Sequence, residues 1–555
     1  LSSTMKKYKN RTYGTILILL IIVGIFSACK EEEPELQLPY MFRPINFNVE
    51  LNKTVATFSW AKVDSAVSYT LQLSNDSLDY SKPLLDVTTT SLSVVKELAG
   101  DTKFYARIRA NAADAAKSSK FNTALSFKTP KENLFQGYGT SINTGVVYSA
   151  YMTDFNALTV KWTPAANVTH LILTNENATA KDSVLISAAE ALAGSKVVSS
   201  LSNSVWKVRI FNNSILRGTT YGTVEGDILV RAGEDLQAAL NSAADGQVIV
   251  LEGGAVYNVG SGTYRFNKSV KLRGTLTSTL PVVCMTVGTG TPPSATSSML
   301  GFVDGSSMQS VKFENIDFTG YVDNNTAATK IGYLFNNNTM TTVSKLSFAN
   351  CNMHNFGNTP MRVQGAKNQV IDSLSINGCK INDIGFSSTY AIVNSNSADL
   401  INAIEIMNST IYNFKGSLVL RTGQTLKSVK VINCNIDHGM QDAGSARYLM
   451  DFNNASFTGG GVTISNCVFG QTGAAMGANG IRYVAGTSVS IKGSYFTTDY
   501  VDDPIPAGAT STSIKPNMTS YKSASTALWT DPVNGNFKLL DTSFGGKGVA
   551  GDLRW

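Results

Sequence analysis

The chain has 555 residues, and 43% of them are hydrophobic, so it is long enough to build more than one hydrophobic core. Its formal net charge of +6 includes four cations, Lys6, Lys7, Lys9 and Arg11, which stand together near the N-terminus. Residues 29–555 alone carry 42 basic and 40 acidic residues and are nearly neutral. Because phosphate recognition requires a concentrated cationic surface, this balance excludes nucleic acid as the expected partner.

The N-terminal segment has the pattern of a bacterial secretory signal. The apolar run 16–26 follows the four cations and is 11 residues long, which is too short to span a bilayer. The run leads into Ser27-Ala28-Cys29, which resembles a lipobox, and the resemblance implies that Cys29 becomes the lipidated first residue. We therefore expect a signal peptide at residues 1–28 and a lipidated tether at residues 29–38.

The tether begins with the acidic stretch Lys30-Glu31-Glu32-Glu33, which is similar to the export signal of Bacteroidota surface lipoproteins. The similarity implies a lipid anchor in the outer membrane, with the protein exposed at the cell surface. The alternative is a solvated tether without an export function, on a protein that faces the periplasm.

Residues 39–129 show the alternation of short β-strands. The segment VATFSW ends at Trp60, and the later segment LAGDTKFYARIRA contains Tyr105. Two-sheet sandwiches bury a Trp between their sheets and place a Tyr at a corner near the sixth strand, and in both respects this segment resembles a fibronectin type III domain. Residues 133–226 repeat the outline with Trp162 in the place of Trp60, although no Tyr occupies the corner. We expect two fibronectin type III-like domains that act as spacers.

A solenoid is predicted for residues 227–555. Its start is marked by the amphipathic helical stretch 235–240, which is followed by the strand 248–251, and the first turns are expected from Val270 onward. A short helix of this kind covers the apolar end of a solenoid.

Seven segments of this region share one template, in which apolar residues alternate, Asn or Gly stands fifth and a small residue usually stands sixth. The segments begin at Val311, Leu346, Leu374, Ile404, Val429, Val462 and Val489, so successive copies are 25 to 35 residues apart. A period-two strand at such bounded intervals fits stacked turns, and Asn and Gly tolerate the left-handed backbone of a bend. Four sixth positions are Cys, which we interpret as packing in a tight corner without disulfides.

The predicted fold is therefore all-β, with two fibronectin type III-like sandwiches followed by a right-handed parallel β-helix. The closing segment 537–555 resembles the end of pectate-lyase-superfamily β-helix proteins of polysaccharide-using bacteria. This resemblance implies a carbohydrate ligand, but the repeat indicates the fold and not the reaction.

Each turn is expected to carry a second strand whose alternation points polar residues outward. The expected outward column is Arg362, Asn394, Arg421, Asp451 and Arg482. Guanidinium groups two turns apart are separated by about 10 Å, so they could bind successive carboxylates of an acidic polysaccharide. Tyrosines along the coil could stack on sugar rings or cap its apolar seams, namely Tyr333, Tyr390, Tyr412, Tyr448 and Tyr483. The alternative is a solvent-facing ladder of weak ion pairs.

The string LVLRTG resembles the strand that bears the catalytic Arg of β-helix alginate and chondroitin lyases, which implies a catalytic role for Arg421 in β-elimination. Those lyases hold Ca²⁺ with acidic residues of neighbouring turns and use Lys or Arg as the base. Here no carboxylates recur on consecutive turns, and Asn394 and Ser395 stand where alginate lyases supply a Lys. The sequence thus leaves enzymatic activity open.

Two further groups of residues are candidates for chemistry. Asp499, Asp502 and Asp503 could bind Ca²⁺ at one end of the coil, although carboxylates before Pro504 are also ordinary loop chemistry. His354 and the pair Asp437-His438 follow the template where a loop begins, and turn packing competes with a role as base. Three functions remain: a glycan-capturing lipoprotein, a pectate-lyase-like enzyme, and an adhesive stalk.

Overall fold

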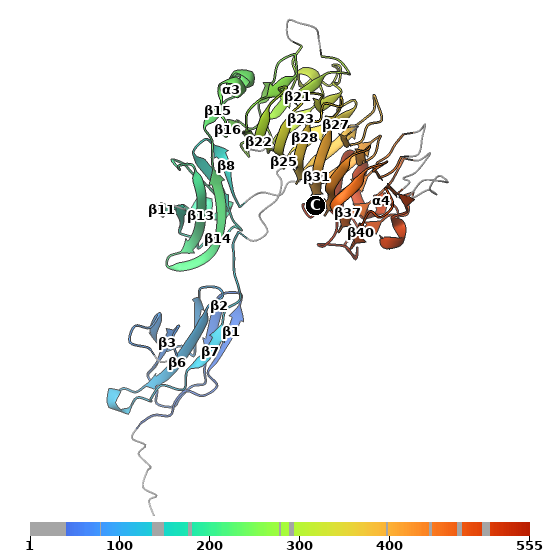
Figure 1. The fold of residues 1–555 in the computed structure, drawn as a ribbon. Helices are drawn as coiled ribbons and strands as arrows, with labels where there is room; N and C mark the ends of the chain where they lie inside the picture. Colours follow the sequence, from blue (N-terminus) through green and yellow to red (C-terminus); the bar gives the residue numbers. More distant parts are fainter. Residues whose placement is uncertain are drawn as a thin grey trace, which may run out of the picture. The chain divides into compact units, whose positions relative to one another are not determined.

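The computed structural model describes residues 40–77, 79–135, 149–175, 180–276, 279–287, 293–395, 398–442, 447–473, 480–501 and 511–555. The chain forms two compact units, Leu1–Glu132 and Asn133–Trp555, whose strands are drawn in Figure 1. The predicted signal peptide, the tether and Cys29 lie outside the described residues. In the described part of the chain, no helix is long and apolar enough to cross a membrane.

The first unit is a sandwich of a three-stranded sheet, β1-β2-β5, and a four-stranded sheet, β4-β3-β6-β7. Its strands are β1 (Asn48–Asn52), β2 (Val55–Ser59), β3 (Ser68–Ser74), β4 (Leu85–Thr89), β5 (Ser93–Glu97), β6 (Lys103–Asn111) and β7 (Leu125–Lys128), with a 3₁₀ turn at Ala115–Lys117. Trp60 is buried between the sheets, and its ring centroid lies 5.5 Å from that of Tyr69. This strand order confirms a fibronectin type III-like sandwich.

The predicted corner tyrosine of this sandwich is wrong. Along β6 the alternation buries Phe104 and Ala106, so Tyr105 lies on the outer face of the sheet and is only half-buried. The buried tyrosine is Tyr69 instead, and its hydroxyl accepts a hydrogen bond from the backbone N–H of Val63 at 2.9 Å.

A second sandwich opens the second unit with the same three-plus-four arrangement, β12-β9-β8 against β11-β10-β13-β14. Its elements are β8 (Ala150–Asp154), β9 (Ala157–Lys161), β10 (His170–Asn175), β11 (Ala180–Leu185), α2 (Ala188–Ala193), β12 (Ser195–Val198), β13 (Ser204–Asn212) and β14 (Ile215–Val224). Trp162 is fully buried, as the position of Trp60 in the first sandwich predicts. The second predicted fibronectin type III-like fold is therefore confirmed.

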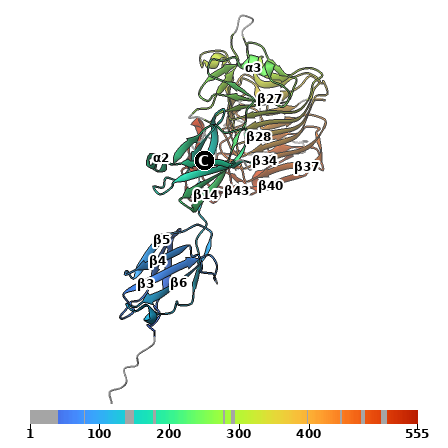
Figure 2. The ribbon, with the colours of Figure 1, turned by 90° about the vertical axis from the view of Figure 1, so that its left-hand side faces the viewer.

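The rest of the second unit is a parallel β-helix with three long sheets, each receiving one strand per turn (Figure 2). The first coil sheet contains β15 (Ile228–Val230), β16 (Val248–Leu251), β19 (Val270–Gly274), β22 (Ser307–Glu314), β25 (Thr342–Ala349), β28 (Val370–Asn377), β31 (Leu400–Met407), β34 (Thr425–Ile432), β37 (Ser456–Ser465) and β40 (Val489–Lys492). The second contains β17 (Val256–Asn258), β20 (Val282–Cys284), β23 (Asp317–Thr319), β26 (Asn352–His354), β29 (Lys380–Ile384), β32 (Thr410–Phe414), β35 (Asn435–Asp437), β38 (Val468–Phe469), β41 (Tyr495–Phe496) and β43 (Thr519–Ser520). The third contains β18 (Tyr264–Phe266), β21 (Ser298–Phe302), β24 (Tyr333–Asn337), β27 (Thr359–Val363), β30 (Val393–Ser395), β33 (Val419–Arg421), β36 (Met450–Asp451), β39 (Ile481–Arg482) and β42 (Ser511–Thr512).

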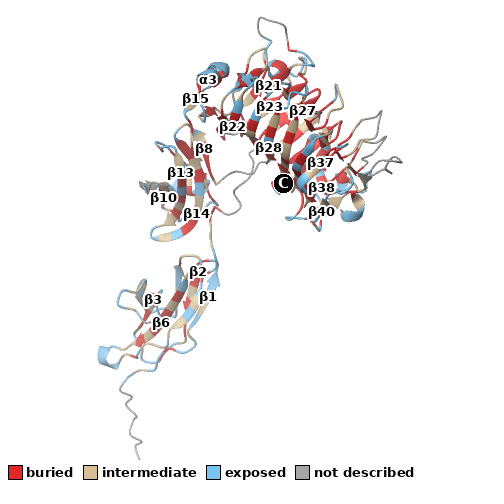
Figure 3. Cartoon of the chain, viewed as in Figure 1, coloured by how far each residue is buried: buried red, intermediate tan, exposed pale blue. Residues whose placement is uncertain are grey.

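The seven template segments lie in register on the first coil sheet. The first residue of each copy pairs with the first residue of the next, from Val311 through to Val489. The fifth residue has a positive φ in all seven copies, between 48° and 67°, as a bend at Asn or Gly requires. The sixth residues are buried, and the five cysteines that the structure describes are all free. Figure 3 shows the resulting alternation of buried and less buried residues along the coil.

The helix α3 (Leu236–Ser242) covers the first turn, as predicted. The Asp235 side chain caps it by accepting the backbone N–H of Ala238 at 3.0 Å, while Leu236 and Leu240 are buried in the coil core. The coil begins before Val270, because β15 and β16 already form its first parallel pair. The second sandwich packs on these turns, since Val250 is buried in the sandwich core.

The last residues fold back over the outer face of the second coil sheet. The C-terminal residues 525–555 contain α4 (Ser525–Leu528), β44 (Trp529–Asp531), a 3₁₀ turn at Pro532–Asn534 and β45 (Asn536–Leu539). Two other 3₁₀ turns of the second unit lie at Val322–Asn324 and Lys515–Asn517. Trp529 and Phe537 form a buried cluster with Tyr412 and Val468 of the sheet. The side chain of Asp552 accepts a hydrogen bond from the Thr410 hydroxyl at 2.7 Å, which ties the segment to the coil.

Candidate functional site

The predicted outward position of Arg421 is wrong. The side chain of Arg421 is 1% exposed, and its Nη1 donates to the Ser395 hydroxyl at 3.0 Å and to the backbone carbonyl of Asp399. Val419 of β33 is buried, and because side chains alternate between the two faces of a strand, Arg421 two residues later also points inward. Burial lowers the pKa of Arg421 to about 10, against the opposing effect of Asp399. A polymeric substrate cannot reach this side chain.

The outer column of the third coil sheet differs from the predicted column at one position. The backbone register aligns Asn336, Arg362, Asn394, Leu420, Asp451 and Arg482. Leu420 therefore stands where Arg421 was expected. Asn394 lies on the column but is buried, so its side chain is not open to a polymer.

Asp451 and Arg482 form a bidentate ion pair in this column. The Nε and Nη2 atoms of Arg482 donate to the two carboxylate oxygens of Asp451 at 2.7 and 2.6 Å. The hydrogen bonds to Asp451 raise the pKa of Arg482, and its guanidinium also lies 4.7 Å from the ring centroid of Tyr448. Tyr483 packs against the coil core instead of lining the column. The charge of Arg482 is therefore already compensated by Asp451, as the alternative of surface ion pairs predicts.

Arg362 has a different environment, which we call the arginine–tyrosine site and which consists of Arg362, Tyr333, Tyr390, Asn336 and Gln364. The guanidinium carbon lies 4.3 Å from the ring centroid of Tyr390 and 5.7 Å from that of Tyr333. Its Nη1 donates to the Tyr333 hydroxyl at 3.1 Å, and the two rings are 6.0 Å apart. Within the described ranges, no carboxylate forms an ion pair with Arg362.

Polar side chains continue the arginine–tyrosine site along the sheet. The Gln364 amide donates to Asn336 Oδ1 at 3.0 Å, and Asn336 pairs with Arg362 in the register of β24 and β27. Burial raises the pKa of Tyr333, against the opposing effect of Arg362, so its hydroxyl stays protonated near neutral pH. Tyr333 and Tyr390, two of the five candidate tyrosines, thus lie beside Arg362, whereas the sequence analysis did not single out Asn336 and Gln364.

The two histidines of the coil are held in internal contacts. His354 Nε2 lies 2.8 Å from Asp317 Oδ1, and its Nδ1 lies 2.6 Å from the Asn355 amide. His438 is hydrogen-bonded to the buried carboxylate of Asp437, and this bond raises the pKa of His438. His354 is the last residue of β26 and His438 directly follows β35, which agrees with turn packing.

The predicted calcium ligands do not form a site within the described residues. Asp499 accepts hydrogen bonds from the Ser525 hydroxyl at 2.7 Å and from the Ser525 backbone N–H, so it holds the start of α4. Asp502 and Asp503 lie outside the described residues. Among the residues that the structure describes, no group of three or more His, Cys, Asp or Glu side chains could hold a metal ion.

Part of the second unit is similar to a protein family of unknown function. A family model with the description "Domain of unknown function (DUF5123)" matches residues 404–555, which span β31 to the C-terminus. No curated protein matches the chain. The chain is an all-β protein that combines fibronectin type III-like sandwiches with a parallel β-helix.

Two solved chicken structures are similar to part of the chain. One is a two fibronectin type III domain segment from tenascin, with 16% identity, a TM-score of 0.16, and coverage of 33% of this chain and 98% of that chain. The other contains the FN1–FN3 domains of CNTN1, with 14% identity, a TM-score of 0.14, and coverage of 33% of this chain and 66% of that chain.

Proposed function

We propose that the protein captures an acidic polysaccharide with the arginine–tyrosine site on the outer face of the third coil sheet. The observation that carries this proposal is the guanidinium of Arg362, which has aromatic neighbours but no carboxylate partner in the described residues. A carboxylate of a uronate sugar can supply that partner through two parallel hydrogen bonds. The proposed ligand is therefore a pectin-like or other uronate glycan.

The aromatic neighbours favour a sugar over a small anion. The partly exposed ring of Tyr390 offers apolar surface that fits the C–H face of a pyranose, while its hydroxyl and the Gln364 and Asn336 amides offer hydrogen bonds to sugar hydroxyls. Tyr333 is buried and holds Arg362 through its hydroxyl. Tyr390 contacts Arg362 without a hydrogen bond, so it orients the guanidinium and leaves the Nη2 donors for a ligand, whereas Nη1 donates to Tyr333 and Nε is buried. A small anion would contact the guanidinium but not the tyrosine ring and the amide groups of the site.

Several features support capture over β-elimination. Arg421, the residue that the lyase resemblance marks as catalytic, is buried. The raised pKa of Tyr333 makes its hydroxyl a poor base at neutral pH. The next polar positions of the outer column are the buried Asn394 and the paired Asp451, so in the described part of the chain no basic side chain of the column stands beside Arg362.

The proposal includes the location of the protein. We propose that Cys29 is lipidated, that the anchor lies in the outer membrane, and that the β-helix is exposed at the cell surface. The sequence features that support this are the cationic and apolar leader, the lipobox-like Ser27-Ala28-Cys29 and the acidic stretch behind it. A surface protein would meet polysaccharide outside the cell.

Affinity electrophoresis in gels that contain pectate, alginate or chondroitin, with dextran as the neutral control, tests the proposal. We expect retardation by at least one acidic glycan, and Arg362→Ala should weaken this binding roughly ten- to a hundredfold, which corresponds to about 1.5–3 kcal/mol for a charge-assisted hydrogen bond. The matched control is Arg482→Ala in the same column at physiological salt, which should change affinity little because this ion pair lies four strands from Arg362, beyond the screening length.

The alternative functions give different results in parallel assays. Release of unsaturated uronides, detected by ultraviolet absorbance with and without Ca²⁺, would identify a lyase instead. Equal retardation of the wild type and Arg362→Ala would refute the site. No retardation by any of the glycans would favour the adhesive stalk.

A further inference from the structure

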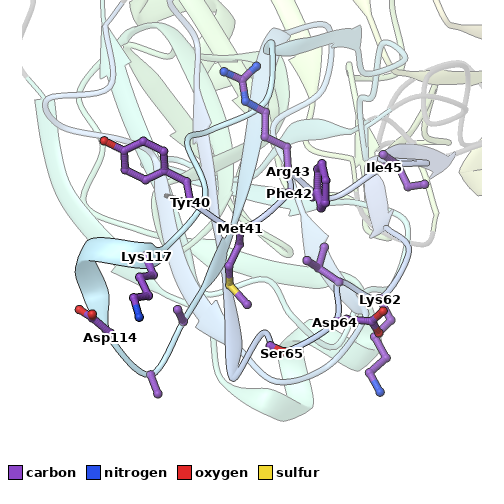
Figure 4. A pocket seen from close by; sticks show the side chains of 13 residues that line it. Tyr40, Met41, Phe42, Arg43, Ile45, Lys62, Asp64, Ser65, Asp114 and Lys117 are labelled. Atoms are coloured by element: carbon purple, nitrogen blue, oxygen red, sulfur yellow. The ribbon is translucent and has the colours of Figure 1, made fainter. Parts of the chain in front are cut away.

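One end of the first sandwich carries an open pocket with a volume of about 780 Å³ (Figure 4). The pocket is lined by residues 40–45, which precede β1, and by the loops around residues 62–65 and 112–117. These two loops follow β2 and β6, so the pocket lies at the end of the sandwich where β3 begins. This end is therefore a defined surface of the first unit.

Large apolar side chains project from this end instead of packing in the core. Phe42 is 71% exposed, Ile45 is 67% exposed and Tyr40 is 50% exposed. Their backbone is held in place, because the N–H of Met41 donates to the Lys117 carbonyl at 2.8 Å and the carbonyl of Ile45 accepts from Ala61 at 2.9 Å. An apolar group that is held outward in this way is typical of an interaction surface.

The charged residues around the pocket are mainly basic. Arg43, Lys62 and Lys117 line it and are exposed, and the ammonium group of Lys120 lies 5.8 Å from the ring centroid of Tyr40. Two carboxylates, Asp64 and Asp114, oppose these four cations. A mixture of exposed aromatic, aliphatic and basic side chains fits the interface of a lipid bilayer, where rings and chains enter the headgroup region and cations meet anionic lipid.

The short chain segment between this end and the proposed anchor favours a lipid surface as the binding partner of the pocket. Cys29 precedes Tyr40 by 11 residues in the sequence. An extended chain advances at most about 3.6 Å per residue, so Tyr40 stays within roughly 40 Å of the lipidated sulfur. The anchor thus keeps this end of the sandwich close to the lipid surface at all times, which raises its effective concentration there.

We propose that this end of the first sandwich docks on the lipid surface, with Phe42, Ile45 and Tyr40 in the headgroup region and the neighbouring cations on anionic lipid. The docking fixes how the first sandwich stands on the membrane. The inference rests on the proposed lipid anchor at Cys29, but it concerns a surface that the glycan does not use.

Fluorophore quenching in vesicles of phosphatidylcholine and phosphatidylglycerol tests the proposal with the lipidated full chain. An environment-sensitive label is attached at Ala113→Cys, an exposed position that lines the pocket, or at Leu84→Cys, which is exposed and pairs with the far end of β3. The five described cysteines are buried and should not react. With nitroxide-bearing headgroups, we expect several-fold stronger quenching at Ala113→Cys than at Leu84→Cys.

The double variant Phe42→Ser, Ile45→Ser should abolish that difference, and its fold should persist because both side chains are exposed. Equal quenching at the two labels, or quenching that survives the double variant, would overturn the docking. In unlipidated Cys29→Ser protein without vesicles, emission of the Ala113→Cys label at shorter wavelength than that of the Leu84→Cys label would also overturn the docking. Such a shift at high dilution would mean that the tether fills the pocket. A shift that grows with protein concentration would mean that a second copy of the chain fills it.

Vesicle flotation separates this inference from the proposed anchor. Protein that floats but carries an unquenched label refutes the docking alone. Protein that does not float refutes the anchor and the docking with it.

Discussion

Replacing the buried Arg421 should lower the stability of the coil without affecting glycan capture. Its side chain is 1% exposed, and its Nη1 donates to the Ser395 hydroxyl at 3.0 Å and to the backbone carbonyl of the fully buried Asp399. In Arg421→Met both hydrogen bonds are lost, and the buried Asp399 carboxylate loses a nearby positive charge. Loss of hydrogen bonds from a charged donor typically costs about 1.5–3 kcal/mol.

Denaturant unfolding of Arg421→Met, followed by far-ultraviolet circular dichroism, measures this loss in the free energy of unfolding. Arg362→Met is the matched control, because Arg362 is half-buried on the outer column and forms no ion pair with any described carboxylate, so its substitution should cost less than about 1 kcal/mol. We expect opposite effects of the two substitutions. Arg421→Met should lose stability and keep glycan affinity, whereas Arg362→Met should keep stability and lose glycan affinity. An Arg421→Met protein that keeps wild-type stability but loses glycan affinity would refute the buried position of Arg421.

Three more substitutions test the coil, its corner and the outer column. Gly378→Ala should be less stable than Gly423→Ala in thermal unfolding: both glycines have positive φ, but a Cβ at Gly378 would lie 2.4 Å from Asn350 Oδ1, whereas nothing lies within 4 Å at Gly423. His438→Gln should flatten the pH dependence of the free energy of unfolding. The pKa of His438 is raised in the folded state, so its protonation stabilises the fold below the ordinary value of 6.5, and this contribution is lost as the pH rises through the folded-state pKa. Equal slopes of unfolding free energy against pH in the wild type and the variant would contradict this. Asp451→Asn should tighten glycan binding at low salt by freeing Arg482, and unchanged affinity would show that the polymer does not reach that turn.

The coil template was predictable from the sequence because each of its positions has a local physical meaning. Inward residues must be apolar, and the bend requires a left-handed backbone that Asn315 and Gly378 tolerate. The seven copies therefore lie in register as predicted. The cap at Asp235 was readable for the same reason, since one side chain satisfies the first backbone N–H groups of α3.

The direction of Arg421 was not predictable, because Leu418, Val419 and Leu420 are all apolar and match either face. The structure buries Leu418 before the short strand begins and Val419 within it, and a slip of one residue reverses every side chain of the strand. The closing segment could not be placed from its sequence either. Its contacts, such as Phe537 with Tyr412 at 5.6 Å between ring centroids, join residues more than a hundred positions apart and follow no repeat.

Charge compensation decides which arginines of the third coil sheet can bind a ligand. Arg421 is hydrogen-bonded in the interior and Arg482 is paired with Asp451, while the guanidinium of Arg362 contacts Tyr333 and Tyr390 and has no carboxylate partner among the described residues. Arg362 and Arg482 are four strands apart, or roughly 19 Å at the spacing of neighbouring strands, which exceeds the screening length at physiological salt. Under the proposed function, the described part of the column would offer one strong carboxylate contact instead of a row of them, and tight binding of a polymer would have to come from several sugar contacts around Arg362.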